Sequence, residues 1–480
     1  MPNRETIQER VAREDLVMFI NASFACSGQR EFYSDASGQS VSIDFLHRYI
    51  LGNYRRLYAR TLAAGVNHFN QSQIVLNLLA TGALTSAADR AEESALITAA
   101  LARLPPQRVF RLFEALRDRR VNNRRTRAVM RAYIAGRRDT AFDAVKYRNR
   151  LRIAAAHAHL SLPGELGAFL FHGWTKRTFQ TELLETFRQA HYAREAVYRL
   201  PYTVAEGLAA RHGIPRDEFL AGIAGQMTAS EKLRLQNAAA GGEVELDIDL
   251  SRAPLTRLAV YVSALATAER ARRERELREA LEGSAARAYR RSPYRLGRVA
   301  AILDRSYSSS GTSEKRRRPL AVAMAASYLL RQAASAYQAF WTPALAKPDD
   351  LFATPYGQTD LAGPLIAALR WKPELVVIVS DGYENAPPGA VCQVLRALRT
   401  QIPGGRDVSV VHLNPVFDAE HFAPRTLGPD LPTVGIRDAE DLLTMLGFAR
   451  FAEGTAPLGE LEAYLENRVA RFLSSRPEVA

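Results

Sequence analysis

Residues 357–382, GQTDLAGPLIAALRWKPELVVIVSDG, contain the stretch of sequence that decides the fold. A Gly-Gln-Thr-Asp turn precedes an amphipathic segment at 361–369, and an aliphatic run at 375–379 then leads directly into Ser380, Asp381 and Gly382. An uninterrupted aliphatic run is typical of a strand buried on both faces of a parallel sheet. The stretch therefore predicts an α/β domain with polar side chains at the carboxyl end of a central strand.

Outward from this stretch, the pattern separates two domains. Aliphatic runs recur at 298–303 and 408–413, with helical stretches at 315–335 and 389–400, which predicts a doubly wound parallel sheet. Upstream, apolar residues at three and four spacing predict an all-helical, HEAT-like solenoid. Its helices are expected at 41–64, 91–104, 109–119, 126–135, 179–199, 204–212 and 216–226. Residues 243–250 are a strand candidate or an acidic edge, and one long helix at 255–290 is expected to join a helical domain, 1–290, to the α/β domain, 291–480.

The composition limits the class of protein. A chain of 480 residues with 47% hydrophobic and 24% charged residues is expected to fold into soluble globular domains, which excludes disorder, collagen and a membrane bundle. The two cysteines, Cys26 and Cys392, lie far apart in sequence and cannot supply a disulfide framework, so the cytoplasm is the expected location. Since no apolar run approaches about 20 residues and the N-terminus lacks a signal-peptide core, neither export nor a membrane is expected.

Positive charge is concentrated in residues 101–152. This segment has 16 Lys and Arg against 4 Asp and Glu, a net +12 of the chain's +13. Arginine binds phosphates and stacks on bases, so a polyanion partner is a hypothesis, although codon bias could explain the high ratio of arginine to lysine. Lys146 and Arg150 are expected on one helix face, with Tyr133 and Tyr147 interleaved to stack a base; the alternative is an ordinary solvated face. The candidate phosphate-binding side chains are Arg124, Arg127, Arg137, Arg138, Lys146, Arg148 and Arg150.

Oxygen ligands follow the predicted strands. The first strand ends in a D-x-S-x-S loop with Asp304, Ser306 and Ser308; Thr359 precedes a helix, and Asp381 follows the strand at 375–379. This all-oxygen set suits Mg²⁺ or another hard divalent cation, and only two carboxylates would leave the ion able to accept an acidic group. The alternative interpretation is a polar strand-to-helix turn with a helix cap.

These residues resemble the metal-ion-dependent adhesion site of von Willebrand factor A domains over residues 295–455. The resemblance implies that Ser306, Ser308 and Thr359 are hydroxyl ligands, while Asp304 and Asp381 act mostly through coordinated water. Tyr307 stands where such loops usually carry glycine, and it is expected to crowd the open position.

The helical half resembles the TROVE module of the Ro autoantigen family, whose members fuse it to a von Willebrand A domain. Residues 24–33 (FACSGQREFY), 123–134 (NRRTRAVMRAYI) and 145–150 (VKYRNR) carry the resemblance. It implies a non-enzymatic ribonucleoprotein in RNA quality control, whose helical ring binds small noncoding Y-like RNAs on a basic surface and admits single-stranded ends of misfolded RNAs. The family's Gly-Trp-Ser-His pattern is missing, so His157 or His159 aligns only loosely with the family's RNA-binding histidine.

Other functions remain as alternatives. The runner-up is a protein-interaction scaffold whose metal site receives an acidic residue from a protein partner. Residues 203–223 could form a DNA-binding helix-turn-helix, but two adjacent helices of a solenoid give the same pattern and are the favoured interpretation. A metal-dependent hydrolase is least favoured, because the sequence shows two carboxylates and no general base near the site, and it has no H-E-x-x-H, G-x-x-x-x-G-K-[ST] or G-x-S-x-G motif.

Overall fold

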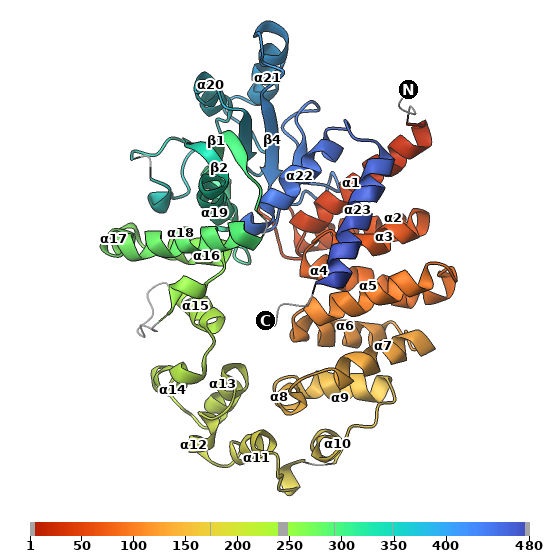
Figure 1. Cartoon of the computed structure of the whole chain (residues 1–480). Coiled ribbons are helices and arrows are strands. Elements are labelled where there is room, and N and C mark those ends of the chain that lie inside the picture. Colours follow the sequence, from red (N-terminus) through yellow and green to blue (C-terminus); the bar gives the residue numbers. More distant parts are fainter. Residues whose placement is uncertain (1–4, 173, 239–247, 292, 348, 476–480) are drawn as a thin grey trace. The chain divides into compact units, whose positions relative to one another are not determined.

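The computed structural model describes residues 5–172, 174–238, 248–291, 293–347 and 349–475 (Figure 1). The chain divides into two compact units, one made of residues 1–70 and 249–468 and the other of residues 71–248 and 469–480. This division differs from a boundary at residue 290, because α1 (Ile7–Ala25) at the start of the chain packs against the last strand of the sheet.

The first unit contains a five-stranded parallel sheet, as predicted. Its spatial order is β2-β1-β3-β4-β5, and every neighbouring pair is parallel. The strands are β1 (Leu296–Asp304), β2 (Ala334–Thr342), β3 (Leu375–Val379), β4 (Ser409–Asn414) and β5 (Thr433–Gly435). The sequence predicted β1, β3 and β4, whereas β2 and β5 were not predicted.

Helices cover both faces of the sheet. On one face Ile302, Val376 and Ile378 pack with Leu365 of α20 (Ala362–Arg370) and Leu395 of α21 (Ala390–Gln401). Because side chains alternate along a strand, Val299, Ala301 and Leu303 face the other side, where α19 (Arg318–Ala333) contacts β1. The remaining helices of this unit are α2 (Ala36–Asn53), α3 (Arg55–Arg60), α16 (Leu255–Ala264), α17 (Thr267–Arg272), α18 (Glu274–Arg291) and α22 (Leu442–Ala452). Helix α23 (Leu458–Ser474) begins in this unit and continues into the second.

The single helix predicted over 255–290 was wrong, since α16, α17 and α18 replace it. Arg270, which is 2% exposed, explains the first break: its guanidinium donates to the carbonyl oxygens of Ser263 and Leu265, at the end of α16. It also donates to Leu351 and Ala353 on the far loop. In Figure 1 the chain turns back at this break, so that α16, α18 and α19 lie together, in agreement with their contacts.

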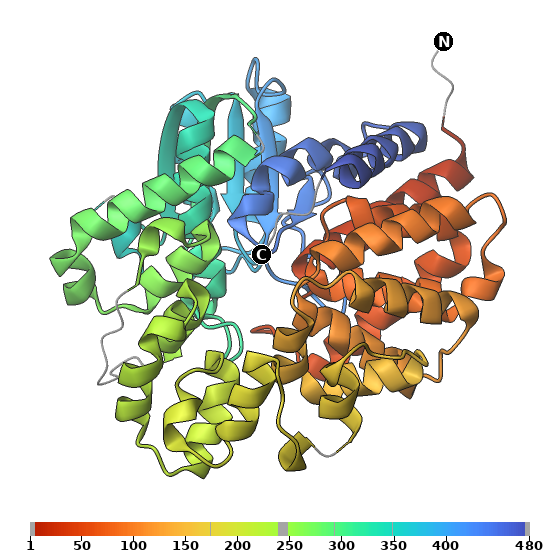
Figure 2. The same ribbon diagram turned by 60° about the horizontal axis from the view of Figure 1, so that its bottom comes forward.

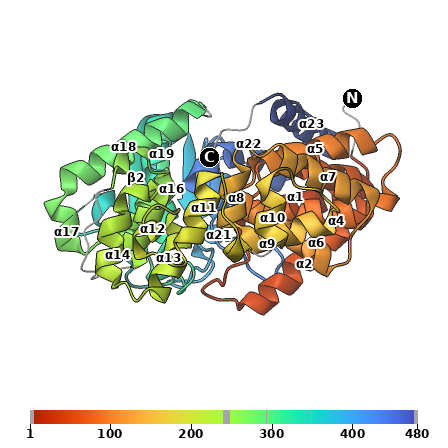
Figure 3. The ribbon, with the colours of Figure 1, turned by 90° about the horizontal axis from the view of Figure 1, so that it is seen from below.

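The second unit is entirely helical in the residues that the structure describes. Figure 2 shows the chain passing through these helices in sequence order, from orange to lime, and Figure 3 shows α8, α9 and α10 next to one another, in agreement with their contacts. The helices are α5 (Arg90–Arg103), α6 (Pro106–Asp118), α7 (Arg124–Ala135), α8 (Thr140–Lys146), α9 (Arg148–His157), α10 (Glu165–Phe171), α11 (Glu182–Gln189), α12 (Arg194–Val197), α13 (Tyr202–Arg211), α14 (Arg216–Ile223) and α15 (Ala229–Ala238), while α4 (His68–Ala80) joins the two units. The helix expected at 179–199 is two helices.

Within the described residues, no helix combines the length and the apolar character needed to cross a bilayer. Most of the strand candidate at 243–250 lies outside the described residues.

Candidate metal centre

The five predicted metal ligands lie where the order of strands in the sheet reverses. The chain passes from β1 to β2 on one side and then returns to β3 on the other, so the carboxyl ends of β1 and β3 adjoin at a topological switch point. Asp304 ends β1, and because Leu303 pairs with Val379, it adjoins Ser380 and Asp381. All five candidate side chains are buried: Asp304, Ser306, Ser308, Thr359 and Asp381.

Hydrogen bonds fix most of these side chains relative to one another. The Ser306 amide donates to Asp304 Oδ1 over 2.7 Å, and the Ser306 and Ser308 hydroxyl oxygens are 3.2 Å apart. The Asp381 Oδ1 accepts from the Tyr383 amide over 3.1 Å. These bonds hold the oxygens of Asp304, Ser306 and Ser308 together after β1 and that of Asp381 in the loop after β3.

Thr359 reaches the same edge through its backbone. Its amide donates to Asn385 Oδ1 over 2.9 Å, and its carbonyl accepts from the Asn385 and Ala386 amides. The neighbouring Gly357 carbonyl accepts from the Tyr307 amide over 3.0 Å. The loop that carries Thr359 thus lies between the loop after β1 and the loop after β3.

The electrostatics of the carboxylates favour a cation. Burial, together with the charge of Asp381, raises the pKa of Asp304 to about 7. Burial also raises the pKa of Asp381, and Ser308 opposes this rise. Two buried carboxylates that disfavour each other's ionisation are stabilised when a positive charge lies between them.

The donors fit Mg²⁺ in their chemistry. Hydroxyl and carboxylate oxygens are hard ligands, and no nitrogen or sulfur belongs to the set. Beside them, Asp304, Asp381 and Ser309 line a void of about 10 Å³, and the buried Ser309 hydroxyl has no hydrogen-bond partner among the described residues. A void of this size is at the lower limit of what can hold one water molecule.

Residues that the sequence did not single out support the loop after β3. The Ser380 hydroxyl lies 3.0 Å from His412 Nε2 on β4 and accepts from the Gly382 amide. Asn414 donates to the Asp381 carbonyl over 3.0 Å. No motif marks His412 or Asn414; only their position at the end of a predicted strand could have indicated them.

Aromatic side chains surround the donors. Tyr307, expected to crowd the metal, is 68% exposed, and its ring lies 6.3 Å from that of Phe32. The aromatic ring stacked near the site is instead Tyr33, whose centroid is 3.7 Å from that of Tyr383. Sequence reasoning named Tyr33 only within residues 24–33, which carry the resemblance to the TROVE module, because nothing in the sequence relates it to a loop about 270 positions away.

A second group of acidic and histidine side chains could hold a metal by its composition, but its members already bind one another. Ligand atoms of Asp418, Glu420 and His421 lie within 4.8 Å of one another. Asp418 already lies 3.0 Å from His421 Nδ1 and 3.6 Å from Arg425, and its other oxygen accepts from the Glu420 amide. We therefore do not assign a metal to this group.

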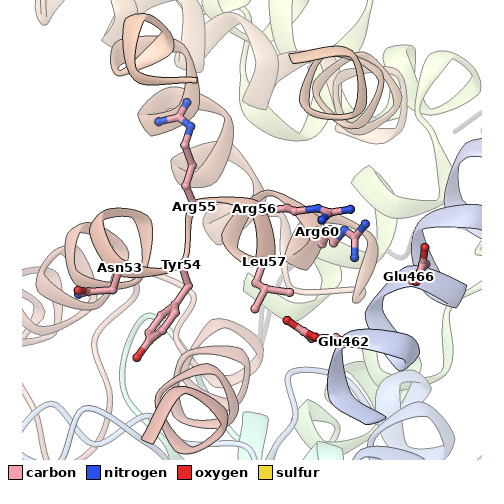
Figure 4. Close-up of a pocket in the computed structure, with 8 residues that line it drawn as sticks. All are labelled: Asn53, Tyr54, Arg55, Arg56, Leu57, Arg60, Glu462 and Glu466. Atoms are coloured by element: carbon pink, nitrogen blue, oxygen red, sulfur yellow. The ribbon is translucent and has the colours of Figure 1, made fainter. Parts of the chain in front are cut away.

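A cavity of about 430 Å³ adjoins α3 and α23 (Figure 4). Arginines 55, 56 and 60 line it together with Glu462 and Glu466 of α23. In Figure 4 the side chains of Arg56 and Arg60 extend toward α23. Because opposite charges line the same space, the cavity is not assigned as a phosphate site.

Several predicted RNA-binding residues of the second unit have acidic partners. Arg137 forms a bidentate pair with buried Asp143, with its shorter contact at 2.6 Å. Lys146 lies 3.8 Å from Glu231, and Arg150 lies 3.3 Å from Glu114. The expectation that Lys146 and Arg150 share one helix was wrong, since α8 ends at Lys146 and α9 begins at Arg148.

The remaining candidates differ in exposure. Arg124 and Arg138 are exposed and Arg127 is half-buried, whereas the guanidinium of Arg148 lies 5.3 Å from the centre of the Trp174 ring. His157 Nε2 bonds to the Val121 carbonyl over 2.9 Å, so His157 has a structural partner. His159 is exposed just after α9, with a φ of 48°.

The two tyrosines expected to stack a base pack within the helices instead. The Tyr133 ring lies 6.0 Å from Phe110 and 5.5 Å from Phe113, and the Tyr147 ring lies 5.2 Å from Phe110. Both tyrosines are half-buried.

Comparison with known proteins found no matching family model and no matching curated protein.

Proposed function

We propose that the protein binds RNA through the second unit, as a non-enzymatic ribonucleoprotein of the Ro type. The observation that carries this proposal is the concentration of exposed arginines in residues 101–152, where the net charge is +12. The exposed arginines of this segment are Arg111, Arg117, Arg119, Arg120, Arg124, Arg131, Arg138 and Arg152. Guanidinium groups at such density neutralise several phosphates at once.

The class of RNA follows from the resemblance of the sequence. The proposed ligands are small noncoding, Y-like RNAs on the basic surface and the single-stranded ends of misfolded RNAs, in RNA quality control. The helical unit is proposed to be a HEAT-like TROVE module that closes into a ring, and the sheet to be a von Willebrand A domain. A cytoplasmic location belongs to the same proposal, with Cys26 and Cys392 both free.

The test measures how RNA affinity depends on salt concentration, because this dependence reports the number of phosphates that the protein neutralises. Binding to single-stranded RNA should weaken with a log–log slope of about −0.7 per phosphate neutralised. The variant with Arg124→Ala and Arg138→Ala should flatten the slope by about 1.4 and weaken binding to many sequences alike. Fluorescence anisotropy over a series of salt concentrations measures it.

The matched control removes two exposed arginines from the first unit, Arg370→Ala with Arg396→Ala. It has the same change in net charge, and its slope should equal that of the native chain. Equal slopes for both double variants would contradict the proposal, and so would a preparation made without nuclease that contains no RNA.

A second candidate function rests on the metal centre. Five buried oxygen donors with only two carboxylates would hold a divalent cation, Mg²⁺ in the first instance, that is under-neutralised and accepts one more acidic group. The protein would then be a scaffold whose metal binds an Asp or Glu of a protein partner. A chelator should release such a partner from the immobilised chain, and a partner retained in EDTA would contradict this function.

A further inference from the structure

A short segment of the N-terminal region lies over the metal loop. We define the strap as residues 29–33. Its backbone is held by the turn that follows the D-x-S-x-S loop: the Arg30 amide donates to Glu314 Oε2 over 3.0 Å, and the Arg30 carbonyl accepts from the Thr312 hydroxyl over 2.9 Å. Both sides of this contact belong to the first unit.

A buried ion pair anchors the strap. Glu31 of the strap pairs with Lys315, and both side chains are almost fully buried. Burial raises the pKa of Glu31, while the Lys315 ammonium opposes that rise. Since separating a buried pair leaves two desolvated charges, this contact fixes where the strap begins its path over the loop.

Local backbone geometry prepares both sides of the contact. Gly28, with a φ of 72°, turns the chain into the strap, and a Cβ there would lie 2.7 Å from the Phe69 ring. Gly311, with a φ of 67°, allows the Lys315 carbonyl to approach, since a Cβ would lie 2.2 Å from its oxygen. Both positions require the left-handed conformation that glycine adopts without strain.

The strap delivers Tyr33 to the metal loop. The Tyr33 ring stacks on Tyr383, which follows Asp381, with centroids 3.7 Å apart and planes at 30°. Phe32 packs edge-on against Tyr33 at 4.9 Å, and Arg425 covers the Tyr383 ring at 4.2 Å. The stack holds the Tyr33 ring in one orientation.

The phenol of Tyr33 lies next to the proposed ligands, because its ring stacks on Tyr383, two residues after Asp381. Against the effect of burial, Ser308, one of the five proposed ligands, acts to lower the pKa of this phenol. Burial, followed by the charge of Asp381, raises the pKa of Tyr33, and Asp304 adds to this rise. The phenol therefore lies within the electrostatic field of both carboxylates.

We propose that Tyr33 is an intramolecular competitor at the metal centre, whose phenol oxygen takes the place that an external carboxylate would occupy. This inference rests on the proposed metal site. Displacing the strap would separate Tyr33 from its stack on Tyr383, beside the metal loop. An external ligand meets an open site only in the fraction of molecules whose strap has moved, so its apparent affinity is lowered by that fraction.

The test uses Mn²⁺ as the metal and acetate as the external carboxylate. Tyr33→Phe removes one oxygen and retains the ring that stacks on Tyr383. Calorimetry on the Mn²⁺-loaded protein should show acetate binding about tenfold more tightly to this variant than to the native chain. The matched control is Tyr307→Phe, which changes an exposed tyrosine on the same loop and should leave acetate affinity within about twofold.

A second measurement follows the strap itself. Hydrogen exchange of peptides covering residues 27–34 should accelerate when acetate is added to the native Mn²⁺-loaded protein, because the strap leaves the loop. A purely structural tyrosine would give no such response. The inference is overturned if Mn²⁺ binds but the acetate affinity of Tyr33→Phe stays within twofold of the native value. If the native chain binds no Mn²⁺, both the metal site and the inference fail.

Discussion

At the scale of single residues, Asp304 has a role that no neighbour can replace. It is one of only two carboxylates in the donor set, and its Oδ1 also orders the Ser306 amide. We expect Asp304→Ala to abolish Mn²⁺ binding, because the remaining donors carry a single negative charge. The fold should persist, since the side chain lies at the end of the strand. Calorimetry measures the binding and circular dichroism the fold.

Asp360 provides the control for this prediction. It lies beside Thr359, but its carboxylate accepts from the Gly363 amide at the start of α20. Asp360→Ala therefore removes an acidic side chain next to the proposed site without removing a proposed ligand, and Mn²⁺ affinity should stay within about threefold. Undiminished binding in Asp304→Ala would refute the assignment of the donor set.

At the scale of elements, β4 carries a titratable group that makes the stability of the folded sheet depend on pH. His412 is fully buried, and its burial lowers its pKa to about 4. Because the unfolded chain binds the proton more readily, with a pKa of about 6.5, the folded state is favoured above that value and loses stability as the pH falls toward 4. From pH 7.5 to pH 5 the expected loss is about 2 kcal/mol.

The variant His412→Gln can keep a polar contact with Ser380 but cannot titrate. Its free energy of unfolding should therefore fall by about 2 kcal/mol less than that of the native chain over the same interval. Hydrogen exchange of the β3 and β4 amides, corrected for the intrinsic effect of pH, measures this difference. The exposed His421→Gln serves as the control, and equal pH dependence in all three proteins would contradict the prediction.

The elements also show how much the sequence could predict. The strands β1, β3 and β4 are uninterrupted aliphatic runs, and each was predicted within two residues of its bounds. By contrast, β2 is a half-exposed edge strand, ASAYQAFWT, that follows α19 with no turn residue between them, so its pattern resembles a continued helix. Similarly, the end of α16 depends on Arg270, whose partners at Leu351 and Ala353 are about 80 residues away.

The metal centre also depends on contacts between residues that are distant in sequence, which local patterns do not reveal. Three motifs placed Asp304, Ser306, Ser308 and Asp381 at strand ends and Thr359 before a helix, and the fold brings these loops to one edge of the sheet. Nothing local could place Tyr33 beside Tyr383, because their stacking depends on how the N-terminal helices dock on the sheet. In the basic segment, composition located the charge, but the pairing of Arg137 with Asp143 depends on the helix boundaries.

At the scale of the whole molecule, the two proposed functions use different units. The metal centre belongs to the first unit and the basic segment to the second. If phosphate contacts carry RNA affinity, EDTA should change that affinity by no more than about threefold, which is under 0.7 kcal/mol. Pull-downs with and without EDTA, probed for RNA and for protein, test both functions. Protein lost on chelation, with RNA absent throughout, would contradict the RNA proposal.

The first unit combines residues 1–70 with residues 249–468, and this has a consequence for biosynthesis. Buried residues of α1, such as Leu16, Phe19 and Ile20, leave the ribosome long before β5 and α22, with which α1 packs. From residue 70 to residue 468, 398 further residues must be added, which takes about 20–80 s at roughly 5–20 residues per second. The nascent helix α1 therefore waits with its apolar face uncovered, and a chaperone that shields it should raise the yield of folded protein.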